Sequence, residues 1–146
     1  MKAVVQRVTR ASVTVDGSVC GRIDNGLLVL LGVGSGDGKQ DAERLAAKIC
    51  RLRIFSDEND KINLSVNDVK GSLLVISQFT LYADCRKGNR PNFMNAAASD
   101  IAEELYEYFC EECKKYVPTV EKGIFGADMK VELLNDGPFT VVLEDI

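Results

Sequence analysis

Hydrophobic and polar positions alternate along the first part of the chain, which is the pattern of β-strands. Residues 2–15 are rich in β-branched side chains and predict a long strand that ends at an Asp16-Gly17 hairpin turn. A short strand is expected over 18–23, and a second turn at Asn25-Gly26 leads to the wholly apolar strand 27–33. These features predict a three-stranded meander at the start of the fold.

Helical spacing of apolar residues occurs twice further along the chain. After a glycine-rich loop at 34–38, which we expect to be flexible, residues 42–52 predict the first helix. The second helix is expected to begin with a cap at Ser99 or Asp100 and to continue to about Tyr116.

Strand and turn signals fill the rest of the sequence. Residues 72–77 predict a buried strand, whereas 54–67 indicate only short, irregular extended pieces. Residues 84–95 carry basic residues and proline among small polar residues and predict a loop. The chain is expected to end with strands near 119–122, 129–135 and 139–143, the last two joined by a turn at Asp136-Gly137-Pro138.

These elements predict an α/β fold: a mixed, strongly curved β-sheet or partial barrel with two main helices packed outside. The helix between strands 27–33 and 72–77 allows a parallel crossover, and a purely antiparallel barrel is the alternative. A length of 146 residues corresponds to a single domain, 1–146. No apolar run approaches the roughly 20 residues of a membrane helix. The N-terminal residues lack the apolar stretch of a signal peptide, so we expect a cytoplasmic protein with no membrane contact.

Composition excludes several kinds of chemistry. The chain has no histidine, which excludes Ser-His-Asp and Cys-His catalysis and histidine-rich zinc sites. Its five cysteines are an odd number in scattered positions and are expected to be reduced thiols. The net charge of −4 argues against indiscriminate nucleic-acid binding but leaves room for a local basic patch.

Two segments are similar to known motifs without matching them. The glycine-rich loop lacks the glycine of a dinucleotide fingerprint at Asp37 and the Ser or Thr of a Walker loop at Gln40. Cys110 and Cys113 form a C-x-x-C pair, but the two glutamates between them disfavour thiolates and no second pair completes a zinc site. We therefore expect a plain loop, two ordinary buried cysteines, and neither metal nor cofactor.

Basic residues gather in two segments of an otherwise acidic chain. The first strand contains Lys2, Arg7 and Arg10, and the loop 84–95 contains Arg86, Lys87 and Arg90. From the sequence alone, these residues form either a patch that contacts phosphates or scattered surface charges.

The polar end of the strand 72–77 is the most unusual feature of the sequence. Ser77, Gln78 and Thr80 lie where a rigid strand enters a loop, a common position for functional groups. Thr80 has no evident base beside it, so hydrogen bonding is favoured over a nucleophilic role. Near the C-terminal end, base rates for X-Pro bonds favour a trans Gly137-Pro138 bond within the expected turn.

Two motifs together resemble the paired signatures of the D-aminoacyl-tRNA deacylase family: SQFTL at 77–81 and N-x-G-P-x-T at 135–140. The resemblance extends over essentially the whole chain, through MKAVVQRV, GLLVLLGV, LRIF, RKGNRP and FGADM. Phe139 stands where the family often has a smaller valine.

The resemblance implies a homodimeric editing enzyme that hydrolyses the ester between a D-amino acid and the terminal ribose of tRNA, and that also acts on glycine mischarged onto alanine tRNA. It further implies that Gly137-Pro138 is cis and reaches across the dimer into the partner's pocket, where it excludes L side chains. The substrate pocket would be lined by Ser77, Gln78, Phe79 and Thr80. The tRNA contacts would be Arg7, Arg86, Lys87 and Arg90.

The mechanism implied by the resemblance needs no histidine. The 2′-hydroxyl of the terminal ribose would replace a protein nucleophile, and backbone N–H groups of Phe79 and Thr80 would stabilise the oxyanion. Two functions of other classes are alternatives. A binding module would hold nucleic acid on the basic loop and on Phe79 or Phe93 without turnover, and a thiol-dependent redox protein would depend on Cys110 and Cys113.

Overall fold

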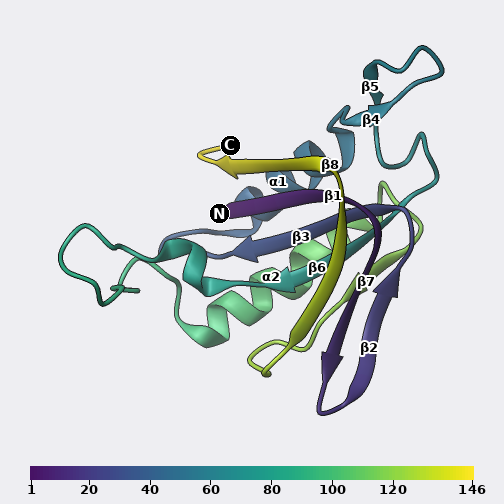
Figure 1. Cartoon of the computed structure of the whole chain (residues 1–146). Helices are drawn as coiled ribbons and strands as arrows, with labels where there is room; N and C mark the ends of the chain where they lie inside the picture. Colours follow the sequence, from purple (N-terminus) through teal and green to yellow (C-terminus); the bar gives the residue numbers. More distant parts are fainter.

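The computed structural model describes all 146 residues, and a strongly curved, six-stranded mixed sheet forms its centre (Figure 1). The strands are β1 Lys2–Val15, β2 Ser18–Ile23, β3 Gly26–Gly32, β4 Phe55–Ser56, β5 Ile62–Leu64, β6 Ser72–Ser77, β7 Val120–Lys122 and β8 Lys130–Glu144. The helices are α1 Lys39–Arg51 and α2 Ser99–Cys113, with a short 3₁₀ helix, η1, at Phe79–Tyr82. The predicted α/β fold with a curved sheet and two outer helices is confirmed.

Parallel pairing connects the middle strands of the sheet. β3 pairs in parallel with β6, and β6 pairs in parallel with β7. The connection from β3 to β6 contains α1, and the connection from β6 to β7 contains α2, as parallel crossovers require. The antiparallel barrel is therefore excluded. Gly26 begins β3 so close to β6 that an added Cβ would lie 1.9 Å from the carbonyl oxygen of Ser72.

Alternation along the strands builds two cores on opposite faces of the sheet. Leu27, Val29 and Leu31 of β3 belong to the larger core, which both helices cover, whereas Leu28 faces a smaller core with residues of β1, β2 and β6. β3 is therefore buried on both faces, as its wholly apolar sequence predicts.

The predicted meander at the start of the chain is wrong. β2 and β3 do not pair with each other; both run antiparallel to β1, with Ala11 opposite Ile23 and Val8 opposite Gly26. They lie end to end along one edge of β1, because a strand of 14 residues is long enough to pair with both in turn. The Asn25-Gly26 signal marks a break between collinear strands, whereas the turn predicted at Asp16-Gly17 is a true hairpin turn with positive φ at both residues.

The two strands expected at the end of the chain form one strand, β8, which pairs with β1 along nearly its whole length. Asn135 lies opposite Val8 and Thr140 lies opposite Gln6, so the four residues 136–139 oppose the single residue Arg7. This bulge replaces the predicted turn. Two register shifts accompany it, and bulges of this kind bend a strand and aim residues away from the ladder.

Smaller expectations have mixed outcomes. Residues 54–67 contain the predicted short pieces, which pair as the two-stranded sheet β4–β5. The predicted cap of α2 is wrong: Ala98 occupies the cap position and makes no side-chain hydrogen bond. No helix combines the length and the low polarity that crossing a bilayer requires.

The buried hydroxyl of Tyr106 joins α2 to β6, the strand that ends at Ser77. It donates a hydrogen bond of 2.8 Å to the carbonyl oxygen of Val75 in β6. Tyr106→Phe should lower the free energy of unfolding by about 1 kcal/mol, because it removes a buried hydrogen bond while the Val75 carbonyl keeps the N–H of Gly123. Urea denaturation would measure this. Tyr108→Phe is the matched control: its hydroxyl bonds to Glu43 at the surface, and we expect a loss below about 0.5 kcal/mol. Equal losses would contradict this account.

Candidate active site

A pocket of about 430 Å³ lies at the carboxyl ends of the parallel strands. The end of β6, the beginning of α2, the segment after β7 and the beginning of β8 surround it. Open parallel sheets commonly bind ligands at this edge, because the loops that follow the strands converge there. The lining residues are Ile76, Ser77, Gln78, Phe79, Ala97, Ser99, Ala102, Phe125, Gly126, Ala127, Asp128, Met129 and Val131.

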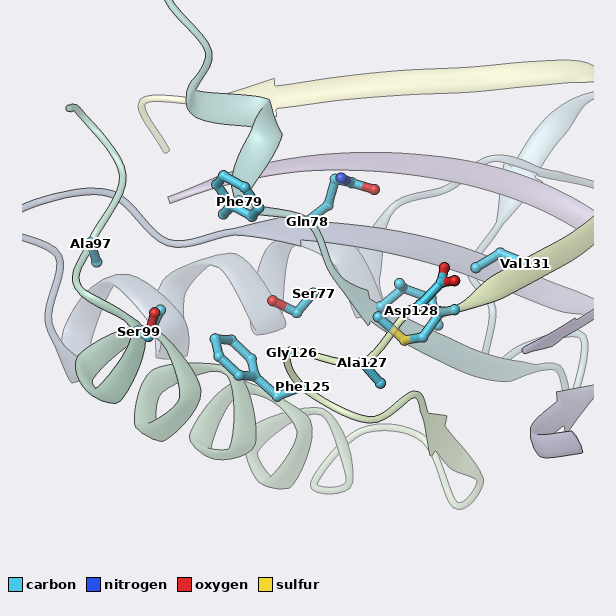
Figure 2. A pocket seen from close by; sticks show the side chains of 13 residues that line it. Ser77, Gln78, Phe79, Ala97, Ser99, Phe125, Gly126, Ala127, Asp128 and Val131 are labelled. Carbon is cyan, nitrogen blue, oxygen red and sulfur yellow. The ribbon is translucent and has the colours of Figure 1, made fainter. Parts of the chain in front are cut away.

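Of the four residues predicted to line a substrate pocket, Ser77, Gln78 and Phe79 line this cavity. Figure 2 shows Ser77 between Gln78 and Phe125, with Ser99 at the start of α2. Phe79 is 54% exposed and packs edge-on against Phe93, with the ring centroids 5.0 Å apart. The pocket is thus mainly apolar, with a few hydroxyl and amide groups, which suits an organic ligand held by a small number of polar contacts.

The segment 125–129 was not predicted as part of the site. It follows β7, the third parallel strand, so its position in the topology could have indicated it. The only carboxylate of the pocket lining belongs to Asp128, which is well exposed and lies 3.2 Å from the ammonium group of Lys130. No histidine is present, so the exposed Asp128 carboxylate, paired with Lys130, is the only general-base side chain in the lining.

Two backbone N–H groups at the start of η1 are free. Those of Phe79 and Thr80 donate no hydrogen bond within the chain, because they open η1 and the first N–H groups of a helix have no partner inside it. The preceding N–H, of Gln78, is used in a bond of 2.7 Å to the carbonyl oxygen of Leu31. The end of β6 is therefore held in the sheet, and two donors remain unpaired at the start of η1, next to the pocket-lining residue Phe79.

Thr80 is the one member of the polar segment outside the pocket lining. Its hydroxyl accepts a hydrogen bond from the side-chain amide of Gln78. The far end of η1 is tied to the loop 34–38 through Tyr82, whose hydroxyl lies 3.4 Å from Oδ2 of Asp37. Burial raises the pKa of Tyr82, and the Asp37 carboxylate raises it further, so the phenol remains a neutral donor.

The basic loop lies beside the pocket, joined to it by the contact between Phe93 and Phe79. Asp84 and Asn92 close the base of this loop with two backbone hydrogen bonds of 2.7 and 2.9 Å. Arg86 binds the carboxylate of Asp84 through two nitrogens, and this bonding lowers the pKa of Asp84 to about 2. Lys87 and Arg90 are exposed and have no partner in the chain. Their charges are thus available, whereas that of Arg86 is neutralised.

Gly137 and Pro138 lie at the tip of the β8 bulge, and the bond between them is cis. The expectation of trans from base rates is therefore wrong, and the isomer implied by the family resemblance is the one present. The side chain of Asn135 closes the bulge: its amide donates to the carbonyls of Arg7 and Phe139 and its oxygen accepts from the N–H of Phe139, at 2.9–3.1 Å.

Arg7, which is predicted to contact tRNA, is engaged within the chain. Its side chain is only 13% exposed. The guanidinium donates to the carbonyl oxygens of Asp136, at 3.0 Å, and Ile54, at 2.8 Å, and it lies over the ring of Phe139. Arg7 is therefore a positioning residue that supports the bulge and joins it to the segment before β4.

The bulge does not reach the pocket of its own chain. No residue beyond Val131 lines the pocket, whereas Gly137 and Pro138 are exposed near Arg7. The outer edge of β8 has no partner strand, and Leu134 and Val142 are 49% and 63% exposed along it. Unpaired edges of this length are usually covered by another chain or protected by charge.

The C-x-x-C pair is unsuited to thiol chemistry. Cys110 and Cys113 are both buried, as predicted for ordinary helix cysteines. Burial raises the pKa of Cys110 to about 12, and contact with Cys50 together with burial raises the pKa of Cys113. Both thiols therefore stay protonated, which argues against the redox alternative.

The sequence matches the family model described as "D-Tyr-tRNA(Tyr) deacylase" over residues 4–144. A protein of Thermosipho africanus named D-aminoacyl-tRNA deacylase is 58% identical over 144 residues, which cover 99% of this chain and 97% of that protein. A protein of the same name from Bacillus cytotoxicus is also 58% identical, with 99% of both chains covered.

Solved structures have the same fold. One described as "c-Myc DNA Unwinding Element Binding Protein" superposes with a TM-score of 0.95 at 44% identity, covering 100% of this chain and 99% of that one. A probable eukaryotic D-amino acid tRNA deacylase has a TM-score of 0.82 at 17% identity, with 97% of both chains covered, and supports the fold alone. With a family match across nearly its full length and relatives that share more than half of its residues, the chain belongs to the D-aminoacyl-tRNA deacylases, a family of ester hydrolases.

Proposed function

We propose that the chain hydrolyses the ester bond of D-aminoacyl-tRNA and releases the D-amino acid and tRNA. The observation that supports this most directly is the pair of free N–H groups at Phe79 and Thr80 beside a mainly apolar pocket. Ester hydrolysis passes through a tetrahedral oxyanion, and removal of one donor from an oxyanion hole typically costs about 100- to 1000-fold in rate. The names of the relatives supply the substrate class.

Catalysis is assisted by the RNA. The pocket has no histidine, and the Thr80 hydroxyl is occupied by the amide of Gln78. The substrate carries its own hydroxyl beside the ester, the 2′-hydroxyl of the terminal ribose, and a group already bound in place gains the advantage of proximity without a protein nucleophile. The protein then orients the ester and the attacking water and stabilises the oxyanion, and the bond from the acyl carbon to the 3′-oxygen breaks to give the free amino acid and tRNA.

A second copy of the chain supplies the selection for D substrates. The cis Gly137-Pro138 unit projects from a sheet edge that has no partner, held by Asn135 and Arg7. Inserted into the pocket of the partner subunit, two fixed carbonyls form a wall that excludes an L side chain sterically. Such a wall makes no specific contact with a D side chain, so it does not select among D-amino acids. Glycine has no side chain and is not excluded. The enzyme accordingly also removes glycine mischarged onto alanine tRNA.

The tRNA approaches over the basic loop. Lys87 and Arg90 offer free charges to phosphates, whereas Arg86 acts mainly on Asp84. The exposed face of Phe79 lies between this loop and the pocket, where a terminal base can stack. An enzyme acting on charged tRNA works in the cytoplasm, where translation supplies its substrate.

Nucleic-acid binding without hydrolysis is the second candidate function. The name of the solved structure at 44% identity describes a DNA-binding protein, and the exposed Phe79 and basic loop suit either role. Turnover separates the two candidates, because a pure binding module holds uncharged tRNA and leaves the aminoacyl ester intact.

Hydrolysis of D- and L-tyrosyl-tRNA by the purified protein tests the proposal. We expect rapid release from the D ester and none from the L ester, and a loss of about 100-fold on the D ester in Gly137→Ala. A Cβ at Gly137 would lie 3.2 Å from the guanidinium of Arg7, at a φ of +141° that disfavours a side chain. Gly17→Ala is the control: its φ is also positive, but no atom lies within 4 Å. An unchanged rate in Gly137→Ala would contradict the role of the bulge.

Substitution of the RNA hydroxyl tests the mechanism. A tRNA that ends in 2′-deoxyadenosine, aminoacylated at its 3′-hydroxyl, should be hydrolysed at least about 100-fold more slowly, since the assisting group is missing. Thr80→Ala should retain activity within about tenfold of the original enzyme, because its hydroxyl only bonds to Gln78. Single-turnover rates on both substrates measure this. Full activity on the deoxy substrate, or loss of all activity in Thr80→Ala, would refute RNA assistance.

A further inference from the structure

A second concentration of positive charge lies away from the pocket. Arg44, Lys48 and Arg51 follow one another along one face of α1, and Arg53 comes directly after the helix. Together they line a groove of about 490 Å³, which is completed by Ala47, Leu52 and Ile146. Four cations in one groove are notable in a chain with a net charge of −4. We call this surface the α1 groove.

The cations of the α1 groove are exposed, and most of their charge is available. Arg44 forms an ion pair with Asp41, and Arg53 bonds to the backbone and side chain of Asn63, a neutral residue. Arg51 lies over the ring of Tyr116, at 5.2 Å from its centroid. Lys48 has no partner in the chain.

Helix stability explains only part of this arrangement. Cations in the last turn of a helix interact favourably with its dipole, which accounts for Lys48 and Arg51. Arg44 lies about two turns from the helix end and Arg53 lies beyond it, so the same effect does not account for them. The groove thus carries more positive charge than α1 itself requires.

The Arg53 end of the α1 groove is connected to the Gly-Pro bulge through the next residue, Ile54. Arg53 precedes Ile54, whose carbonyl oxygen accepts a 2.8 Å hydrogen bond from Arg7. Arg7 also donates to the carbonyl of Asp136 in the bulge, so one guanidinium joins the bulge to the residue that follows Arg53. Figure 1 shows the end of α1, β4 and the bend of β8 at the same end of the molecule.

We propose that the α1 groove binds the phosphate backbone of the tRNA acceptor arm whose terminal adenosine occupies the partner's pocket. This inference rests on the proposed function, because insertion of the bulge into the partner's pocket brings the adjacent groove to the same pocket mouth. The helix rises about 10 Å from Arg44 to Arg51, a length over which a nucleic-acid duplex presents several phosphates. Each subunit then contributes the chiral wall and part of the RNA-binding surface to the site of the other.

The double variant Lys48→Gln/Arg51→Gln, in the full-length protein, tests this proposal. The control is Arg22→Gln/Lys70→Gln, which removes two exposed cations outside the groove. Two substrates are compared: D-tyrosyl-tRNA and D-tyrosyl-adenosine, which has the same ester but no phosphates. We expect the kcat/KM ratio of the tRNA ester to the adenosine ester to fall about tenfold in the groove variant, through KM. The slope of log KM against log salt concentration should fall by about two. The control should match the original protein.

The outcomes separate the inference from the function on which it rests. If the groove variant behaves like the control while the original protein hydrolyses both esters, the α1 groove does not contact tRNA and the inference fails alone. If the original protein hydrolyses neither ester, the proposed function fails and the inference fails with it. Both substrates have the same ester, so a partial loss of folded enzyme lowers both kcat/KM values equally and leaves their ratio unchanged. An unchanged ratio in the groove variant therefore contradicts the proposed tRNA contact, even if its overall activity is lower.

Discussion

The parallel pairing of β3 with β6 is the constraint on which the rest of the structure depends. It requires a crossover, so α1 must cover the sheet, and it requires Gly26, because any side chain there would collide with the backbone of Ser72. It also fixes where β6 ends. The two strands run in the same direction, so Ser77 and the free N–H groups that follow it emerge at the same edge as the loop after β3. The pocket forms at this edge, between the segments that follow β6 and β7 and the beginning of α2.

The second feature of the site comes from a different part of the sheet. The bulge in β8 consists of four residues opposite Arg7, and its backbone groups are satisfied by the side chains of Asn135 and Arg7 rather than by the ladder. This arrangement presents Gly137-Pro138 to the outside, away from the residues that line the pocket of the same chain. A pocket and an outward-facing bulge on the same chain are consistent with a dimer in which the bulge of each chain enters the pocket of the other.

Local patterns predicted the elements whose signals are repeated along the sequence. The apolar spacing of α1 and the uniform apolar run of β3 describe burial directly, and both elements are present. Turn signals were less reliable, because Asn25-Gly26 and Asp136-Gly137 have the same local chemistry in a break or a bulge as in a hairpin. The break is decided by the pairing of both β2 and β3 with the long strand β1, and the bulge is decided by the pairing of β8 with β1. The candidate site shows the same division. The polar residues after β6 could be recognised in the sequence, whereas the contacts of Arg7 and the groove that the cations of α1 line depend on the tertiary structure.

Subunit mixing tests the central claim, that each pocket is completed by the bulge of the other chain. One variant is Gly137→Ala, and the other is Ala127→Phe, which fills the pocket from the segment after β7. Each homodimer should have little activity on D-tyrosyl-tRNA. After the two are unfolded together and refolded, half of the dimers are mixed and each of these has one intact site. Activity should therefore return to about a quarter of that of the original enzyme. If the mixture is no more active than the two variants separately, the pocket and the bulge do not act across a dimer.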